Sequence, residues 1–405
     1  MKKLFLMKNL IESAKSVLKE NDRGKMTIPS SKLYPHMWAW DSVFAAMGWA
    51  HIDMNRAEAE LAYQLDSAWD NGMIPHIVFD KNHLKDYFPG PDIWGHGSST
   101  TITQPPVWAI GLDYLLDKGL QSDRMVEYLT QLEKTHLFFY KHRDPEHLNL
   151  VAISHPWESG MDNSPAWDLP LKAVSSESRF ELNRVDVKKV ENPDERPSDL
   201  EYKKYLRLVQ DLRTNEFSPT EFLTYDPFMS TVLYLSELAL DKMAKKFGFE
   251  TKALQRASAI KSSLMNFFDP QTGRFLYRDS LRKENYTSPT LASLFPVLIE
   301  ELDPQIRDRA LQTLKEEHLT EFGLTTYSKA DKKFDDVCYW RGPVWINTNF
   351  FFWNLFPEEL YASVKNLITQ QGFREYYSPT DGSGLGATNF SWTAALFLVM
   401  NKERL

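Results

Sequence analysis

Helical periodicity runs through almost the whole chain and is the feature that most constrains its fold. Apolar residues recur at spacings of three and four, which is the pattern of amphipathic helices. No Pro-, Gly- or Ser-rich linker interrupts this pattern, so it favours one all-α body over domains joined by a tether. The pattern predicts thirteen helices, at 6–20, 39–51, 54–70, 103–117, 121–142, 198–212, 227–247, 250–268, 287–301, 303–316, 341–355, 358–371 and 387–401.

The number of helices indicates how the body can close. Setting 198–212 aside leaves twelve, and twelve antiparallel helices can form six inner and six outer helices, an (α/α)6 barrel. An α-solenoid would show much the same periodicity, although the sequence has no visible repeat of 30–50 residues. We therefore expect an all-α (α/α)6 barrel, a single domain over 1–405 with an inserted cap-like segment at about 163–226.

Two short stretches depart from the helical pattern. The turn residues of 269–273 are followed by alternation over 274–278, which predicts a small hairpin. The glycine-rich stretch 382–386 follows no parallel strand and has no Lys-Ser/Thr after it, so it does not resemble a phosphate loop. A tight turn before the last helix is the simpler interpretation.

Composition narrows the classes of partner and compartment. The chain has 47 Lys and Arg against 55 Asp and Glu, a formal net charge of −8, which argues against nucleic acid or an anionic membrane as a partner. A single cysteine, Cys338, excludes a disulfide framework and a cysteine-rich zinc site. The apolar run near the start is too short for a signal peptide, and no stretch is long enough to span a bilayer. We expect a cytoplasmic protein, although a chain without disulfides could also be exported.

The non-helical connections 71–102, 143–197 and 318–340 are unusually long for a compact domain. They are rich in Trp, Tyr, His, Asp and Gly rather than in Ser and Lys. Long ordered loops of this composition commonly build a site on a rigid scaffold. The ten histidines are scattered without a metal-binding spacing, so neither a metal nor a cofactor is expected.

The chemistry that remains is that of carboxylates set among aromatic side chains. Four clusters combine them, at 38–41, 155–168, 339–345 and 374–377. Sugars suit such surroundings, because their C–H faces stack on aromatic rings while Asp, Asn and Arg bind their hydroxyls. Glycoside hydrolysis in addition needs two carboxyl groups in different protonation states.

Simpler interpretations of the same residues stay open at this point. Asp162 lies in an Asp-Asn-Ser-Pro turn signal and could be only a turn or cap residue. Glu375 could lie at an exposed helix end without a function. Clustered tryptophans are more often core than sugar platform, so a carbohydrate-binding or scaffold protein remains an alternative to a sugar hydrolase.

Taken together, these clusters resemble glycoside hydrolase family 63, a family of (α/α)6-barrel enzymes related to the trehalases. The stretch 155–165, His-Pro-Trp-Glu-Ser-Gly-Met-Asp-Asn-Ser-Pro, resembles the motif of the family's general acid, which falls on Asp162. Tyr-Trp-Arg-Gly-Pro-Val-Trp at 339–345 resembles a second signature. Glu-Tyr-Tyr, followed by Gly-Leu-Gly and Asn-Phe-Ser-Trp, resembles the closing segment, whose general base falls on Glu375. The similarity runs from about residue 34 to 401.

The resemblance implies an inverting mechanism without a metal cofactor. Asp162 and Glu375 should then lie about 6.5–9.5 Å apart, with room for the attacking water between them. Asp162 must hold its proton near neutral pH, and burial among Trp157, Met161 and Trp167 would favour this by raising its pKa. Glu375 must stay ionised, so polar neighbours or a nearby cation should serve it. Glu158 and Asp168 are expected to be structural.

The remaining site residues are also implied by the resemblance. The sugar subsite is expected to be shaped by Trp40, Asp41, Gln104, Trp157 and Trp340, with Gly160 beside the acid. A mobile lid is expected to carry Tyr34, Tyr87 and Tyr339, and a glycerate is expected to be held by Arg196 and Tyr202. An Arg fork can bind both oxygens of a small carboxylate. Arg196 lies in a charged run, however, and could simply be solvated.

The chain lacks the added β-domains of the large glycan-processing glucosidases and resembles the compact members that hydrolyse mannosylglycerate or glucosylglycerate. The expected function is therefore inverting hydrolysis of a small α-glycoside of this kind. An α-glucosidase for neutral disaccharides or small oligosaccharides is the main alternative, and a catalytically dead sugar-binding toroid is a further one. The sequence decides neither the sugar nor the oligomeric state.

Overall fold

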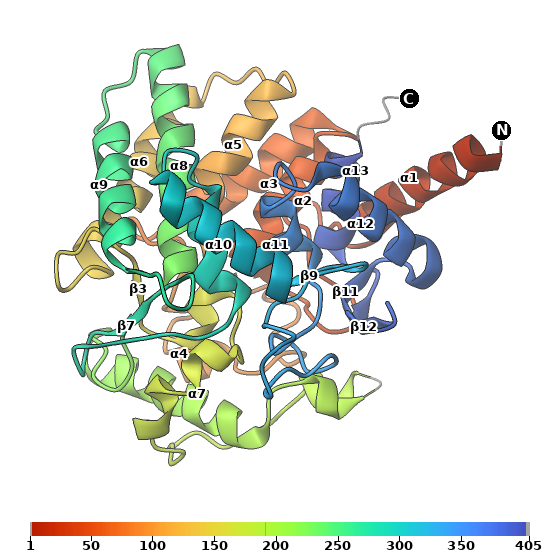
Figure 1. Cartoon of the computed structure of the whole chain (residues 1–405). Helices are drawn as coiled ribbons and strands as arrows, with labels where there is room; N and C mark the ends of the chain where they lie inside the picture. Colours follow the sequence, from red (N-terminus) through yellow and green to blue (C-terminus); the bar gives the residue numbers. More distant parts are fainter. Residues whose placement is uncertain (1, 191, 402–405) are drawn as a thin grey trace.

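The computed structural model describes residues 2–190 and 192–401, and helices dominate it (Figure 1). The α-helices are α1 Lys2–Glu20, α2 Ala39–Trp49, α3 Met54–Asp66, α4 Pro91–Trp94, α5 Trp108–Asp117, α6 Met125–His142, α7 Asp199–Thr214, α8 Pro227–Phe247, α9 Ala253–Asn266, α10 Pro304–Glu317, α11 Ile346–Phe351, α12 Pro357–Gln371 and α13 Ser391–Met400. The 3₁₀ helices are η1 Pro156–Ser159, η2 Pro165–Trp167, η3 Pro170–Ala173, η4 Asp186–Lys188, η5 Pro193–Glu195 and η6 Leu291–Leu298.

The strands are short and form small antiparallel sheets. They are β1 Met37–Trp38, β2 Ile77–Val78, β3 Ala152–Ile153, β4 Thr224–Tyr225, β5 Phe268–Asp269, β6 Arg274–Phe275, β7 Tyr277–Asp279, β8 Glu284–Tyr286, β9 Leu319–Thr320, β10 Gly323–Leu324, β11 Arg374–Tyr377 and β12 Gly384–Thr388. β3, β4, β7 and β8 form one sheet in that order, and the other strands pair two by two. The pairing of β5 with β6 confirms the predicted hairpin.

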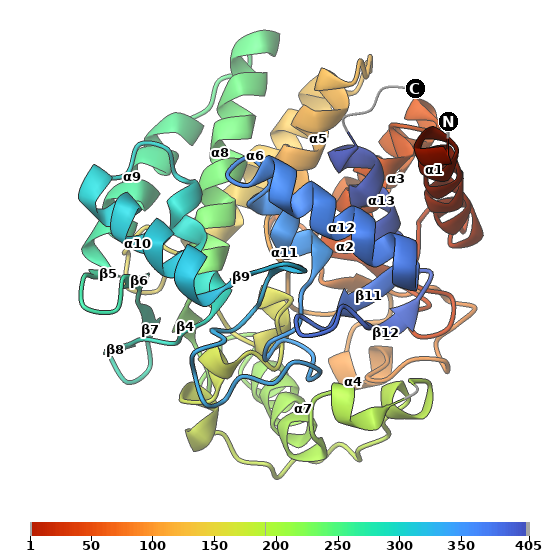
Figure 2. The same cartoon turned by 45° about the vertical axis from the view of Figure 1, so that its right-hand side comes forward.

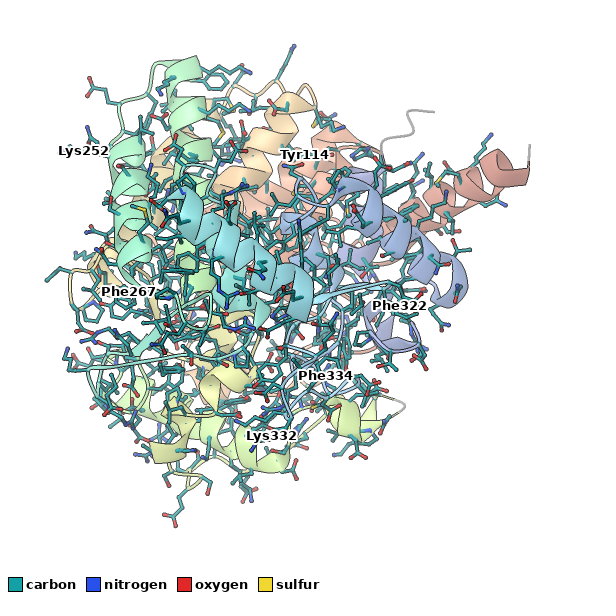
Figure 3. The ribbon with its side chains drawn as sticks, viewed as in Figure 1. Tyr114, Lys252, Phe267, Phe322, Lys332 and Phe334 are labelled. Carbon is teal, nitrogen blue, oxygen red and sulfur yellow. The ribbon has the colours of Figure 1, made fainter. Side chains whose placement is uncertain are left out.

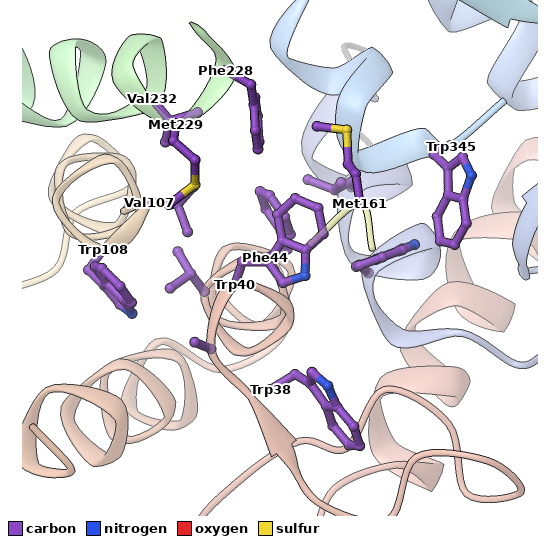
Figure 4. Packing of buried hydrophobic residues seen from close by; sticks show 14 of the residues in the cluster. Trp38, Trp40, Phe44, Val107, Trp108, Met161, Phe228, Met229, Val232 and Trp345 are labelled. Atoms are coloured by element: carbon purple, nitrogen blue, oxygen red, sulfur yellow. The ribbon is translucent and has the colours of Figure 1, made fainter. Parts of the chain in front are cut away.

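The fold is an (α/α)6 barrel, as the sequence predicts. In the described part of the chain, α2, α5, α8, η6, α11 and α13 form the inner ring, and α1, α3, α6, α9, α10 and α12 pack outside it. The inner helices α2 and α13 are buried over their whole length, as the centre of a barrel requires. The rings of Phe44, Phe351, Phe295 and Phe228 contact one another in turn in the core, and the Phe295 and Phe351 rings, 5.5 Å apart, join η6 to α11. Figure 4 shows Phe44 and Phe228 in this core.

Two predicted inner helices differ from the prediction, and each has a physical reason. The segment predicted at 287–301 is the 3₁₀ helix η6, because Pro296 lies inside it and has no backbone N–H to donate. The helix predicted at 341–355 is shorter, since α11 begins at Ile346, after Pro343. The predicted turn at 382–386 was also incomplete, because most of that stretch belongs to β12, which pairs with β11.

The long connections gather at one end of the barrel. In both views α4 and α7 lie below the helical body, with β7 above them, while α1 and α13 lie on its upper right (Figures 1 and 2). Figure 3 shows Lys332 and Phe334 of the connection 318–340 in this lower half, whereas Tyr114 and Lys252 lie at the upper end. Within the ranges described, no helix is both long and apolar enough to cross a membrane.

Candidate active site

One cavity lies among the connections and the starts of the inner helices. Its free space, open mouth included, is about 600 Å³. Every site residue predicted from the sequence lines it, namely Tyr34, Trp40, Asp41, Tyr87, Gln104, Trp157, Gly160, Asp162, Arg196, Tyr202, Tyr339, Trp340 and Glu375. These residues come from parts of the chain more than 300 residues apart, so the fold alone brings them together.

Asp162 follows η1 and Gly160, and the backbone around it is firmly held. The hydroxyl of Tyr205 donates to the Asp162 carbonyl at 2.7 Å, and the next residue, Asn163, accepts from the backbone N–H of Trp340 at 2.9 Å. Burial raises the pKa of the Asp162 carboxyl to about 7, and the nearby charge of Glu375 adds to this, while Arg196 opposes it. The side chain therefore carries a proton close to neutral pH, as a general acid requires.

Glu375 lies on β11 with only 1% of its surface exposed, so the alternative of an exposed helix end is wrong. The hydroxyl of Tyr34 donates to its Oε1 at 2.7 Å, and the backbone N–H of Ala387 on β12 donates to its Oε2 at 2.9 Å. Arg196 Nη1 lies 3.3 Å from Oε1. These three donors fix the position of the carboxylate, as a general base that orients a water molecule requires.

Only 7% of the surface of Arg196 is exposed, so the alternative that this residue of a charged run is solvated is wrong. Its Nη2 donates to the Tyr34 hydroxyl at 2.7 Å, and its guanidinium lies 4.1 Å from the centre of the Tyr339 ring. A cation near Glu375 was expected, but the sequence did not identify it as Arg196, which lies 179 positions away and forms this ion pair. Tyr202, in the first turn of α7, lines the same cavity.

Aromatic rings form a wall of the cavity. Trp40 at the start of α2 lies 6.2 Å from Trp340, which stacks on Trp345 at 3.8 Å. Figure 4 shows Trp40 and Trp345. Gly160 lies against this wall with a φ of +71°, and a Cβ there would come within 2.5 Å of the Trp40 ring. Only glycine combines that conformation with so close an approach.

Two further polar residues lie beside Trp40. Gln104 accepts a hydrogen bond from the backbone N–H of Trp40 at 3.2 Å, which fixes the start of α2. Asp41 is 4% exposed, and burial raises the pKa of its carboxyl well above the ordinary range. A buried carboxyl that lines a cavity can bind a sugar hydroxyl.

Glu158 and Asp168 do not line the cavity, as expected of structural residues. Glu158 is fully buried in an ion pair with Arg143, and both carboxylate oxygens of Asp168 accept hydrogen bonds from Arg341. The second pair ties the connection that carries Asp162 to the connection that carries Trp340.

Sequence reasoning missed several residues that line the cavity, namely Pro29, Trp38, His76, Pro197, Phe390 and Trp392. Trp38 and Trp392 belong to stretches already recognised as motifs, so their positions offered a signal. His76 had none beyond its place in a long connection. Burial lowers the pKa of His76 to about 3, so its ring is neutral. Over the described ranges, no cluster of His, Cys, Asp and Glu could hold a metal ion.

A closed helical barrel whose aromatic-lined cavity holds two carboxyl groups, one of them with a pKa raised to about 7, has the features of a glycoside hydrolase. Comparison with known proteins agrees. Residues 34–393 match the mannosylglycerate hydrolase MGH1-like glycoside hydrolase domain. The chain belongs to this family and is an O-glycosyl hydrolase.

Relatives match over nearly the whole chain. The mannosylglycerate hydrolase of Thermus thermophilus is 36% identical over 95% of this chain and 99% of its own length. The glucosylglycerate hydrolase of Mycolicibacterium hassiacum is 32% identical over 97% and 98%. Among solved structures, a family 63 mannosylglycerate hydrolase, also from Thermus thermophilus and in complex with Tris and D-glycerate, superposes with a TM-score of 0.89 at 36% identity and covers 96% and 99% of the two chains.

Proposed function

We propose that this chain hydrolyses mannosylglycerate or glucosylglycerate, with inversion at the anomeric carbon, to the free sugar and glycerate. The observation that carries the proposal is the buried Arg196, which shares one cavity with Asp162 and Glu375. An arginine guanidinium suits a small carboxylate aglycone, because it can donate hydrogen bonds to both carboxylate oxygens. The names of the relatives support the same two substrates.

In this mechanism Asp162 acts as the general acid. Its pKa of about 7 keeps the proton available at neutral pH, and the proton passes to the glycosidic oxygen as the bond to the anomeric carbon breaks. Glu375 acts as the general base and takes a proton from the water that attacks the opposite face of the sugar. Each group is expected to contribute roughly 10²–10⁴-fold in rate.

The other residues of the cavity bind and enclose the substrate. Trp40, Trp157 and Trp340 offer faces for the sugar ring, while Asp41 and Gln104 offer acceptors for its hydroxyls. The glycerate is assigned to Arg196 and Tyr202. Both come from the segment at about 163–226, which we propose acts as a cap inserted into a single domain.

Three further assignments follow from the sequence. Tyr34, Tyr87 and Tyr339 are proposed as the tyrosines of a lid that closes over the substrate. The enzyme is assigned to the cytoplasm, where a chain with one cysteine needs no disulfide. Its partner is a small glycoside, with neither nucleic acid nor membrane required.

Proton NMR of the anomeric signals tests the function and its mechanism together. Mannosylglycerate and glucosylglycerate are each incubated with the protein, with Asp162→Asn and Glu375→Gln as matched variants. We expect the β-anomer of the free sugar to appear first, and both variants to be inactive. Initial release of the α-anomer would contradict inversion.

The two alternative functions, a neutral α-glucosidase and a sugar-binding toroid, are tested with neutral α-glucosides and with a binding assay. Cleavage of α-linked glucose disaccharides but of neither glycerate glycoside would support the neutral α-glucosidase instead. Binding without turnover on all substrates would indicate a sugar-binding toroid.

A further inference from the structure

The guanidinium of Arg196 is already occupied on the side that faces the cavity. Nη1 donates to both oxygens of Glu375, at 3.3 and 3.5 Å, and Nη2 donates to the hydroxyls of Tyr34, at 2.7 Å, and Tyr339, at 3.5 Å. A carboxylate aglycone would need these same two terminal nitrogens. Substrate and general base therefore compete for one arginine.

The other edge of the guanidinium faces a second buried carboxylate. Arg196 Nε lies 3.5 Å from an Asp186 oxygen, and Arg184 binds Asp186 through two nitrogens, one of them at 2.8 Å. Asp186 is only 9% exposed. The charge of Asp186 attracts the guanidinium from this side while the terminal nitrogens exchange one partner for another.

Glu375 keeps other donors when Arg196 leaves it. The Tyr34 hydroxyl at 2.7 Å and the Ala387 N–H at 2.9 Å do not come from the arginine. A carboxylate has about four acceptor positions, so loss of the arginine frees positions on Oε1 and Oε2 for a water molecule. The same oxygens are then free to accept the proton of that water.

We propose that Arg196 serves two carboxylates in turn: it pairs with Glu375 in the empty site and transfers to the carboxylate of the aglycone when substrate binds, which releases Glu375 to act on water. This inference rests on the proposed function and deepens it. An acidic aglycone then accelerates the chemical step as well as binding. An arginine that only held the aglycone would instead alter KM and leave kcat unchanged.

A glycosyl fluoride separates the two effects, because fluoride leaves no glycerate in the aglycone position. The α-fluoride of whichever sugar the enzyme accepts is used. Water attacks the anomeric carbon, the C–F bond breaks, fluoride departs with the electron pair, and the water proton passes to Glu375. Fluoride release is measured with and without added D-glycerate, and glycerol serves as the matched neutral compound.

We expect D-glycerate to raise kcat for the fluoride in a saturable way, by roughly tenfold given the size of general-base effects. Glycerol should have no such effect. Inhibition by D-glycerate, or no change in kcat, would overturn the inference. Loss of activity on both the fluorides and the glycerate glycosides would instead overturn the proposed function.

Two variants check that the response passes through Arg196. Arg196→Gln should lose the response to D-glycerate. Arg207→Gln removes an arginine from α7 in the same cap segment, where it pairs with Glu221 away from the cavity, and should keep the response. An equal response in Arg196→Gln and the wild type would overturn the assignment to Arg196.

Discussion

Arg143 and Glu158 form a buried ion pair at the base of the connection that carries Asp162, with Arg143 Nη2 2.7 Å from Glu158 Oε1. The Glu158 carboxylate also accepts from the backbone N–H groups of Ser154, at 2.7 Å, and Thr103, at 3.2 Å. One side chain thus joins the end of α6, the acid-bearing connection and the segment before Gln104. Its role is to hold these three parts together.

Replacing Glu158 by Gln should therefore cost stability more than chemistry. The change leaves Arg143 charged and unpaired in the interior, and breaking a buried pair in this way costs about 3–5 kcal/mol. Urea unfolding measures the loss. Glu127→Gln, which breaks an exposed pair with Arg124 on α6, is the control and should change little. An unchanged free energy of unfolding in Glu158→Gln would contradict the structural role given to Glu158.

The pKa of Asp162 predicts how activity depends on pH. A general acid with a pKa of about 7 loses its proton as the pH rises, so kcat/KM for the glycerate glycoside should fall above about pH 7. Fluoride needs no proton to depart. Asp162→Asn should therefore retain most of its activity on the glycosyl fluoride while losing the glycerate glycoside, whereas Glu375→Gln should lose both. Equal loss of both substrates in Asp162→Asn would exclude the acid role.

Sequence patterns predicted the barrel because the signals of its helices are local: outer helices such as α3 and α10 are amphipathic, and the inner helices α2 and α13 are apolar on every side. The candidate residues were found because they lie in contiguous motifs, such as the one around Asp162. Helix η6 was mistaken for an α-helix, since its periodicity persists although Pro296 removes a backbone donor.

The contacts within the site could not be predicted in the same way. Glu375 lies on β11, a strand of four residues without apolar alternation, whose partner β12 comes after a turn. Its pairing with Arg196 depends on how the cap segment folds over the barrel. Contacts of this kind arise from tertiary packing and leave no local signal in the sequence.

Asp226 offers a test of buried charge away from the cavity. It caps α8 through the N–H of Phe228 at 2.9 Å, its Oδ2 has no partner within the described structure, and burial raises its pKa to about 7. The folded protein holds this proton more tightly than the unfolded chain, in which the carboxyl has a pKa near 3.8. The resulting contribution to the free energy of unfolding is complete below pH 3.8 and is lost as the pH rises through 7.

Asp226→Asn keeps a good cap and removes the cost of ionisation. Asp226→Asn should exceed the wild type in stability by more at pH 8 than at pH 5, and this difference should reach about 2.7 kcal/mol, which corresponds to the two pH units between 5 and the folded pKa of about 7. Thermal unfolding at the two pH values measures this difference. Asp53→Asn, at the exposed cap of α3, is the control. A gap between Asp226→Asn and wild type that is the same at both pH values would contradict the prediction.

Gly386 on β12 lies against the proposed base. Its φ is +64°, and a Cβ there would come within 2.5 Å of Glu375 Oε2 and 2.6 Å of the Tyr376 ring. Gly386→Ala should therefore displace the carboxylate, and a misplacement of about 1 Å can cost roughly 10²-fold in rate.

Gly248, which ends α8, separates this effect from backbone strain. It has a similar φ of +66°, but a Cβ there would meet no atom within 4 Å. Gly248→Ala should lose about 1 kcal/mol of stability and keep its kcat, because only the left-handed backbone opposes the substitution. Both variants are compared by unfolding and by turnover of the glycerate glycoside. Since the strain is the same in the two variants, an unchanged kcat in Gly386→Ala would mean that the position of Glu375 does not limit the reaction.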